Sequence, residues 1–97
     1  MLNHKYIILD RDGVINHDSP AYIKSKEEWI PIDRSLEAIG LLTKHSYRIL
    51  LLSNQAGVSR EIIEYKALLD IHNKLLSSCL EHGGKIFSTY YCYDHPD

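Results

Sequence analysis

The sequence predicts an α/β fold in which a parallel sheet is flanked by helices. Three apolar runs, at Tyr6–Leu9, Tyr47–Leu52 and Ile86–Cys92, are continuous rather than alternating. Continuous runs are typical of parallel strands that are covered on both faces. Helical spacing fills the stretches before the second and third runs, and right-handed crossovers through such helices make neighbouring strands parallel. We therefore expect the order β–α–β–α–β.

Both connecting helices can be placed from their spacing. The first has apolar positions through residues 36–42, and Asp33 or Ser35 can cap its start. The second, over residues 65–80, repeats apolar residues at i, i+3, i+4 and i+7. Gly83 and Gly84 follow where that helix should stop. A long loop from residue 13 to residue 32 is left between the first strand and the first helix.

Composition limits the classes of partner and the compartment. The chain has 97 residues, 11 Lys and Arg against 13 Asp and Glu, and a formal net charge of -2. That length predicts a single domain over residues 1–97. Charge this close to neutral gives no electrostatic reason to expect nucleic-acid or membrane-surface binding, and no apolar run approaches the roughly 18 residues of a membrane span. Two cysteines, Cys79 and Cys92, make no disulfide framework, so we expect a cytoplasmic protein.

A pair of carboxylates follows the first predicted strand. Asp10-Arg11-Asp12-Gly13 begins where the apolar run stops, and ligands of open α/β sheets bind beyond the carboxyl ends of the strands. Two carboxylates that share one crevice repel each other and need a cation, and Mg²⁺ prefers such oxygen ligands. The same residues also fit a strand end with an Asx turn. The pattern Asp-x-Asp-Gly alone leaves both interpretations open.

A second polar segment follows the second predicted strand. Residues 53–57, Ser-Asn-Gln-Ala-Gly, combine a hydroxyl, backbone N–H groups and a glycine turn, which together can hold a phosphate. Arg60 could bind phosphate oxygens in a bidentate manner. Alone, this segment also fits an ordinary strand–helix loop. If the two strands are parallel neighbours, however, Ser53 and Asp10 meet at one edge, and the combination favours a phosphoryl-transfer site.

These motifs carry a resemblance to a known family. DRDGVIN at residues 10–16 and SNQAGVSR at residues 53–60, with Tyr22 and Tyr91-Cys92, resemble the haloacid dehalogenase-like (HAD) hydrolases. The similarity is greatest to the branch of heptose 1,7-bisphosphate phosphatases and histidinol phosphatases. It implies a Rossmann-like HAD core, of which this chain would be the N-terminal portion, truncated after the third strand.

The resemblance also implies roles for single residues. Asp10 would be the nucleophile that forms an aspartyl-phosphate, and Asp12 would be the general acid and then the general base. The Asp10 carboxylate and the Asp12 backbone carbonyl would bind Mg²⁺. The residues implied at the phosphate or the sugar are Ser53, Asn54, Arg60, Asn16, Asp18 and Tyr22.

Two departures from the family pattern stand out. The family carries a third motif with a phosphate-binding Lys and a fourth with metal-binding Asp residues, and residues 1–97 contain neither. The first strand would then form an apolar sheet edge at which copies of the chain could associate. Zinc-binding relatives use more ligands than Cys92 and His95, which cannot close a tetrahedral site. Zinc is therefore expected only in a longer chain.

The expected function is Mg²⁺-dependent hydrolysis of a phosphomonoester of a small metabolite. The residues of the two motifs favour D-glycero-D-manno-heptose 1,7-bisphosphate as the substrate. Histidinol phosphate remains an alternative, since the two branches share these motifs. A catalytically incomplete fragment that acts as a binding or interaction half-domain is a second alternative. A phosphoacceptor domain of the receiver type fits less well, because the SNQAGVSR segment and the long loop from residue 13 to residue 32 are foreign to it.

Overall fold

A computed structural model of the chain describes residues 4–55, 58 and 63–92. The elements of the described residues follow the predicted order. In chain order they are β1 (Lys5–Asp10), the short 3-10 helix η1 (Lys26–Glu28), α1 (Ser35–Lys44), β2 (Tyr47–Asn54), α3 (Tyr65–Glu81) and β3 (Ile86–Cys92).

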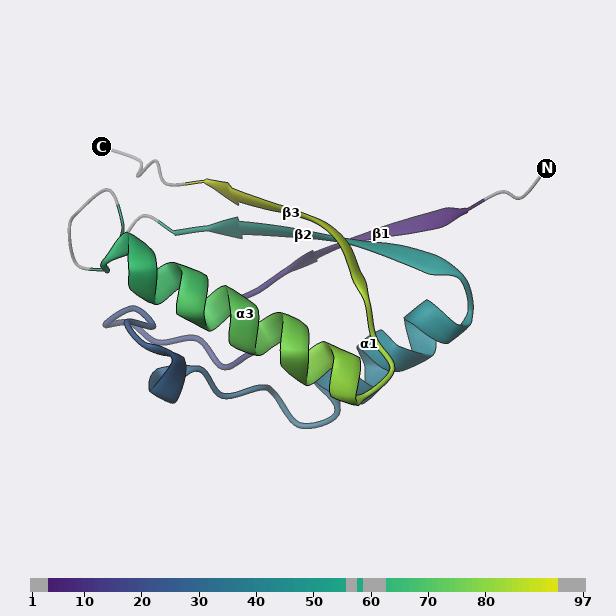
Figure 1. Cartoon of the computed structure of the whole chain (residues 1–97), viewed down its shortest axis with the longest axis horizontal. Helices are drawn as coiled ribbons and strands as arrows, with labels where there is room; N and C mark the ends of the chain where they lie inside the picture. Colours follow the sequence, from purple (N-terminus) through teal and green to yellow (C-terminus); the bar gives the residue numbers. More distant parts are fainter. Residues whose placement is uncertain (1–3, 56–57, 59–62, 93–97) are drawn as a thin grey trace.

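The strands form one parallel sheet in the order β1-β2-β3, as Figure 1 shows. In its register Asp10 pairs with Leu52 and Ser53 pairs with Tyr91. The strand ends that carry both motifs therefore lie at one edge of the sheet. Within the described residues β1 is an outer strand of the sheet, which confirms the edge expected from the sequence.

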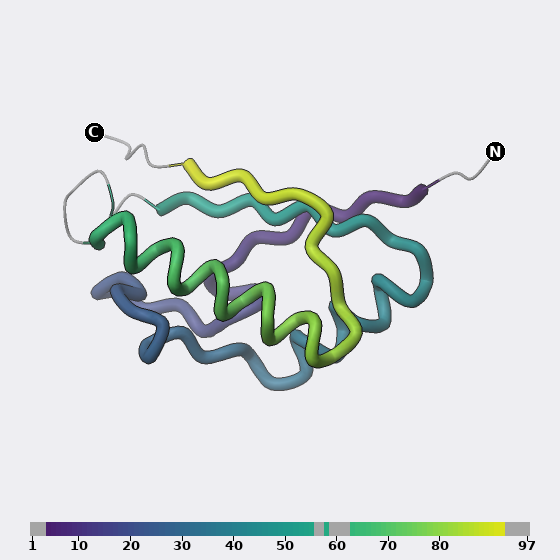
Figure 2. Tube along the Cα trace, in the orientation of Figure 1, coloured from purple at the N-terminus to yellow at the C-terminus, as the bar shows by residue number. Residues whose placement is uncertain are grey.

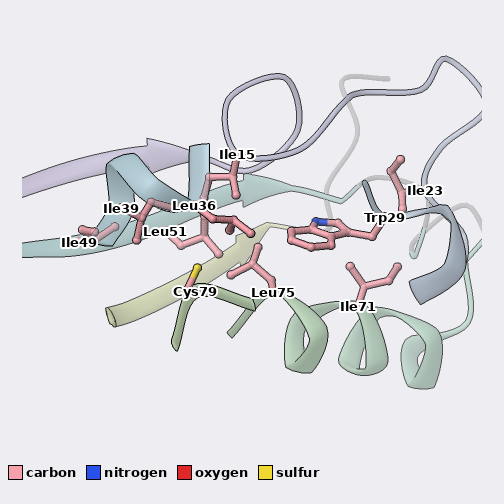
Figure 3. Close-up of a cluster of buried hydrophobic side chains, with 10 residues drawn as sticks. All are labelled: Ile15, Ile23, Trp29, Leu36, Ile39, Ile49, Leu51, Ile71, Leu75 and Cys79. Carbon is pink, nitrogen blue, oxygen red and sulfur yellow. The ribbon is translucent and has the colours of Figure 1, made fainter. Parts of the chain in front are cut away.

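A hydrophobic core fills the space between the sheet and the two helices (Figure 3). Ile49 and Leu51 of β2 face Leu75 and Cys79 of α3, and all four side chains are fully buried. Burying an aliphatic side chain of this size contributes about 1.5–3 kcal/mol. Cys79 is thus a core residue, as expected from the apolar stripe of its helix, and burial raises the pKa of its thiol to about 11.

The opposite face of the sheet differs from the expectation. The sequence predicted strands covered on both faces, but both helices lie on one side (Figure 1). The large apolar side chains exposed on the strands are Tyr6, Ile8, Leu52, Phe87 and Tyr90. The cause is topological. Both crossovers step across the sheet in the same direction, and crossovers of one hand that do so place their helices on the same face.

The helix ends agree in part with the ends that the sequence predicted. α3 ends at Glu81, and Gly83 has a positive φ of 78°, as the two glycines predicted. No side chain caps α1, because Arg34 occupies the N-cap position. The Ser35 hydroxyl instead donates to the Ile15 carbonyl at 2.7 Å. The predicted cap therefore fastens the long loop to the helix.

The loop between β1 and α1 is anchored by its own apolar side chains. Ile15, Ile23 and Trp29 are buried in the core. Lys74 of α3 also donates to the Trp29 carbonyl at 3.0 Å. Figure 2 shows the loop running beside α3 toward the end of the molecule where β2 and β3 end. Residues 18–23 are thereby brought to the edge of the sheet that carries the motifs.

Candidate active site

A pocket of about 360 Å³ opens at the carboxyl ends of β1 and β2. Its walls come from the two strand ends and from the long loop. The lining residues are Asp10, Asp12, Asp18, Ser19, Pro20, Tyr22, Ile23, Asn54 and Gln55. The structure therefore brings the first motif, the second motif and the loop together around one space.

Asp10 is the last residue of β1, and its side chain is exposed to this pocket. Its Oδ1 accepts a hydrogen bond of 2.7 Å from the backbone N–H of Arg11. That bond fixes the rotation of the carboxylate at the place where the chain leaves the sheet. An exposed, oriented carboxylate of this kind can act as a nucleophile or as a cation ligand.

Asp12 is held much more tightly than Asp10. Its Oδ1 accepts from Arg11 Nε at 3.1 Å, from Arg11 Nη2 at 2.9 Å and from Asn16 Nδ2 at 2.9 Å. Only 20% of the Asp12 side chain is exposed, while the Arg11 side chain is fully buried. Hydrogen bonds to ionised groups are stronger than neutral ones, so Asp12 has one well-defined orientation.

Gln55 joins the two motifs directly. Its Nε2 donates to Asp12 Oδ2 at 2.9 Å and to Ser53 Oγ at 2.8 Å. The exposed fractions of Ser53 and Gln55 are 2% and 3%, so this bridge lies almost entirely out of solvent. Asn54 is exposed and lines the pocket. The expectation that the two strand ends meet is confirmed by this bridge.

The comparisons with known proteins agree with this geometry. No family model matches the chain. A curated relative from Pseudomonas putida, D-glycero-beta-D-manno-heptose-1,7-bisphosphate 7-phosphatase, is 43% identical over 93 residues, which are 96% of this chain and 53% of the relative. A crystal structure of the D,D-heptose 1,7-bisphosphate phosphatase from Bordetella bronchiseptica, complexed with magnesium and phosphate, has a TM-score of 0.93 at 41% identity, covering 96% of this chain and 52% of that one.

A crystal structure from Mesorhizobium loti that is named a HAD-like phosphatase has a TM-score of 0.83 at 25% identity, covering 95% of this chain and 43% of that one. The chain is similar to these HAD-like phosphatases in sequence and matches about half of their fold. The resemblance stated from the motifs is thus confirmed. The chain spans about half the length of the curated relatives it matches.

Behind the two motifs lies a partly buried polar cluster that the sequence did not indicate. The Arg11 guanidinium lies 6.0 Å from the centre of the Tyr91 ring, and the Tyr91 hydroxyl is hydrogen-bonded to His72 Nδ1 at 2.8 Å. Burial, and then the positive charge of Arg11, lower the pKa of His72. His72 therefore serves as a packed polar residue, as expected from its place on the helix.

Sequence reasoning missed the two residues that organise the site, Arg11 and Gln55. Both stand inside the quoted motifs, and both are polar residues next to a strand end. An Arg between two acids could have been assigned a partner on charge alone. Gln55 could not, because the direction of its side chain depends on how the chain turns after β2.

The other predicted site residues fall into three groups. Asp18 and Tyr22 line the pocket, and Tyr22 has a positive φ of 66°. Asn16 is fully buried and donates to Asp12, so the structure places it behind the acid rather than on the pocket wall. Arg60 and His95 lie outside the described residues.

Two absences apply to the described residues alone. Among them, no three or more His, Cys, Asp and Glu side chains gather in an arrangement that could hold a metal ion. No helix in the described ranges is long and apolar enough to cross a membrane.

Proposed function

We propose that this chain carries the nucleophile and general-acid part of a Mg²⁺-dependent phosphatase whose substrate is D-glycero-D-manno-heptose 1,7-bisphosphate. One observation carries the proposal. Asp12 and Ser53, which come from separate motifs, share the amide of Gln55 beside the exposed carboxylate of Asp10. A nucleophile and a proton donor at the pocket, with the buried hydroxyl of Ser53 directly behind Gln55, are parts that phosphate-ester hydrolysis needs.

The reaction follows from the positions of the two acids. An oxygen of Asp10 attacks phosphorus while the bond between phosphorus and the sugar oxygen breaks. Protonated Asp12 gives its proton to that leaving oxygen. Water then attacks the aspartyl-phosphate, Asp12 takes up the proton of the water, and the bond from phosphorus to Asp10 breaks to release phosphate. Positioned acid–base catalysis of this type contributes typically 10²–10⁴-fold in rate.

The donor atoms at this rim fit Mg²⁺. Mg²⁺ is usually bound by one or two carboxylates together with waters and substrate phosphate oxygens, rather than by a complete protein cage. The Asp10 carboxylate, with the Asp12 backbone carbonyl as the second ligand, supplies such a set of hard oxygens. A bound Mg²⁺ would neutralise charge that develops on the phosphoryl group. The magnesium and phosphate in the Bordetella structure support this choice.

The names of the relatives support the choice of substrate. Those from Pseudomonas putida, Bordetella bronchiseptica and Chlorobaculum tepidum all act on a heptose 1,7-bisphosphate. Nothing in the comparisons favours histidinol phosphate or a purely binding half-domain. We assign the phosphate to Ser53, Asn54 and Arg60, and the sugar to the wall formed by Asp18 and Tyr22.

The remaining proposals concern the chain as a whole. Residues 1–97 form one HAD-type unit that carries the first two motifs and acts in the cytoplasm on a free phosphorylated sugar. Copies associate through the exposed edge of β1, because an unpaired apolar strand is a template for pairing. Zinc would need ligands beyond Cys92 and His95.

The proposal is tested by phosphate release from heptose 1,7-bisphosphate with and without Mg²⁺. We expect Mg²⁺-dependent turnover that falls by at least about 10³-fold in Asp10→Asn, because an amide is a poor nucleophile. Asp70→Asn is the matched control, since Asp70 lies on α3 and pairs with exposed Lys66. Turnover that persists in Asp10→Asn, or its absence from the unaltered chain, would refute the proposal.

A further inference from the structure

The side-chain amide of Gln55 hydrogen-bonds to Asp12 of the first motif and to Ser53 of the second. Its nitrogen has two hydrogens, and the structure directs one to Asp12 Oδ2 and the other to Ser53 Oγ, at 2.9 and 2.8 Å. The side chain is almost wholly buried. Each hydrogen of the amide thus has a separate acceptor on a different strand end.

The chemistry of these acceptors fixes the orientation of the amide. While Asp12 is ionised its carboxylate can only accept hydrogen bonds, so in that state the nitrogen of Gln55, and not its oxygen, faces Asp12. The second N–H then reaches Ser53 Oγ, which must act as the acceptor. A hydroxyl that accepts a bond still has its own proton to donate. Ser53 is therefore left as a donor to an anion.

The two oxygens of Asp12 are used unequally. Oδ1 accepts three hydrogen bonds from Arg11 and Asn16, whereas Oδ2 accepts one from Gln55. A carboxylate has about four lone-pair sites over its two oxygens, so Oδ1 has no site left for a proton. The proton that Asp12 transfers must be carried on Oδ2, the oxygen that Gln55 holds.

We propose that Gln55 is a positioning residue that sets two protons at once: it aims the proton-bearing Oδ2 of Asp12, and it leaves the Ser53 hydroxyl free to donate to a phosphate oxygen. This role rests on the proposed phosphatase function. Gln55 itself takes no part in bond making. It acts by giving the acid and the hydroxyl their orientations before the substrate binds.

The bridge is tested first without any turnover, by NMR of the ¹⁵N-labelled chain. Both side-chain amide protons of Gln55 should be shifted downfield and slow to exchange. Ser53→Ala should move one of them upfield and leave the other, because only one acceptor is lost. Ser77→Ala, on the exposed side of α3, should move neither. Gln55 amide protons that resemble those of a solvent-exposed glutamine would overturn the bridge.

The role is tested next by two substitutions of nearly the same shape. Gln55→Met removes both N–H donors, and we expect kcat to fall about 10²-fold, a loss within the range of general acid catalysis. Gln55→Glu puts a carboxylate against Asp12 at high pH, but a protonated Glu can donate one bond. The kcat of Gln55→Glu relative to the unaltered chain should therefore rise at least about tenfold between pH 8 and pH 5.

The outcomes separate the two proposals. A pH-independent kcat ratio for Gln55→Glu, or full kcat in a folded Gln55→Met, would refute the positioning role. If Gln55→Met does not fold, the pH ratio of Gln55→Glu and the amide protons of the unaltered chain decide the question. If the unaltered chain releases no phosphate, the phosphatase proposal fails, and the NMR result alone decides whether the bridge exists.

Discussion

At the scale of single residues, the charge pair of Arg11 and Asp12 connects stability with the site. Arg11 is fully buried, and its Nη1 has no hydrogen-bond partner among the described residues. Its Nε and Nη2 both bind Asp12. A buried cation that loses its anion is left with an uncompensated charge, which is expensive. The catalytic acid of the proposal is therefore also a structural counter-ion.

Replacing Asp12 tests this double role. We expect Asp12→Ala to lower the free energy of unfolding by about 3 kcal/mol, because the Arg11 guanidinium loses its partner. Asp12→Asn also removes the counter-charge but keeps a side-chain oxygen that can accept from Arg11, so it should cost less than Asp12→Ala. Urea unfolding of both variants measures the difference. Equal losses in the two variants would show that the free energy of unfolding does not depend on a side-chain oxygen at position 12 that accepts from Arg11.

At the scale of elements, the sequence predicted the strands, the helices and the meeting of the two strand ends correctly. Periodicity and glycines were sufficient because each signal is local to its element. The exposed sheet face was not predicted, since the apolar runs at Tyr6 and Ile8 look the same whether or not a helix covers them. The role of Ser35 was missed for a similar reason, because its acceptor, Ile15, lies 20 residues away.

The burial of His72 on α3, and then the nearby positive charge of Arg11, make stability depend on pH. The pKa of His72 is lowered in the folded chain, whereas in the unfolded chain it returns to about 6.5. As pH falls below 6.5, the unfolded chain binds this proton and the folded chain does not, so stability decreases. Above pH 6.5 both states are neutral at this residue and the effect vanishes.

His72→Gln should therefore remove part of the loss of stability between pH 7.5 and pH 5.5. The glutamine keeps a polar partner for the Tyr91 hydroxyl but does not titrate. His45→Gln, at an exposed position after α1, is the matched control and should leave the slope as it is. Urea midpoints at the two pH values provide the measurement. A slope that is unchanged in His72→Gln would contradict the assignment.

At the scale of the whole molecule, the open face of the sheet and the outer strand β1 are the features on which the proposed self-association rests. Exposed apolar side chains that share one face often mark an interaction surface, and Ile8 is 64% exposed at the outer strand. We expect the chain to associate as its concentration rises. Ile8→Lys should reduce that association, because lysine on an edge strand opposes pairing, and should change the unfolding free energy by less than about 0.5 kcal/mol.

Sedimentation velocity over a range of concentrations measures the effect. Leu80→Lys is the matched control, since Leu80 is 67% exposed on α3, away from the sheet. Equal loss of association in both variants would show that copies associate through nonspecific hydrophobic contacts rather than through the sheet. A chain that stays monomeric at all concentrations tested would contradict the proposed association.

The register of the sheet has a consequence for any polypeptide that docks on β1. Asp10 closes the outermost described strand and pairs with Leu52 on its inner side only. A parallel strand added along the vacant side would therefore finish next to Asp10 and pass its following residues over the pocket mouth. Whatever joins the sheet there becomes a neighbour of the Asp10 carboxylate and of the pocket that it lines, so under the proposed function a docking partner would also help to shape the active site.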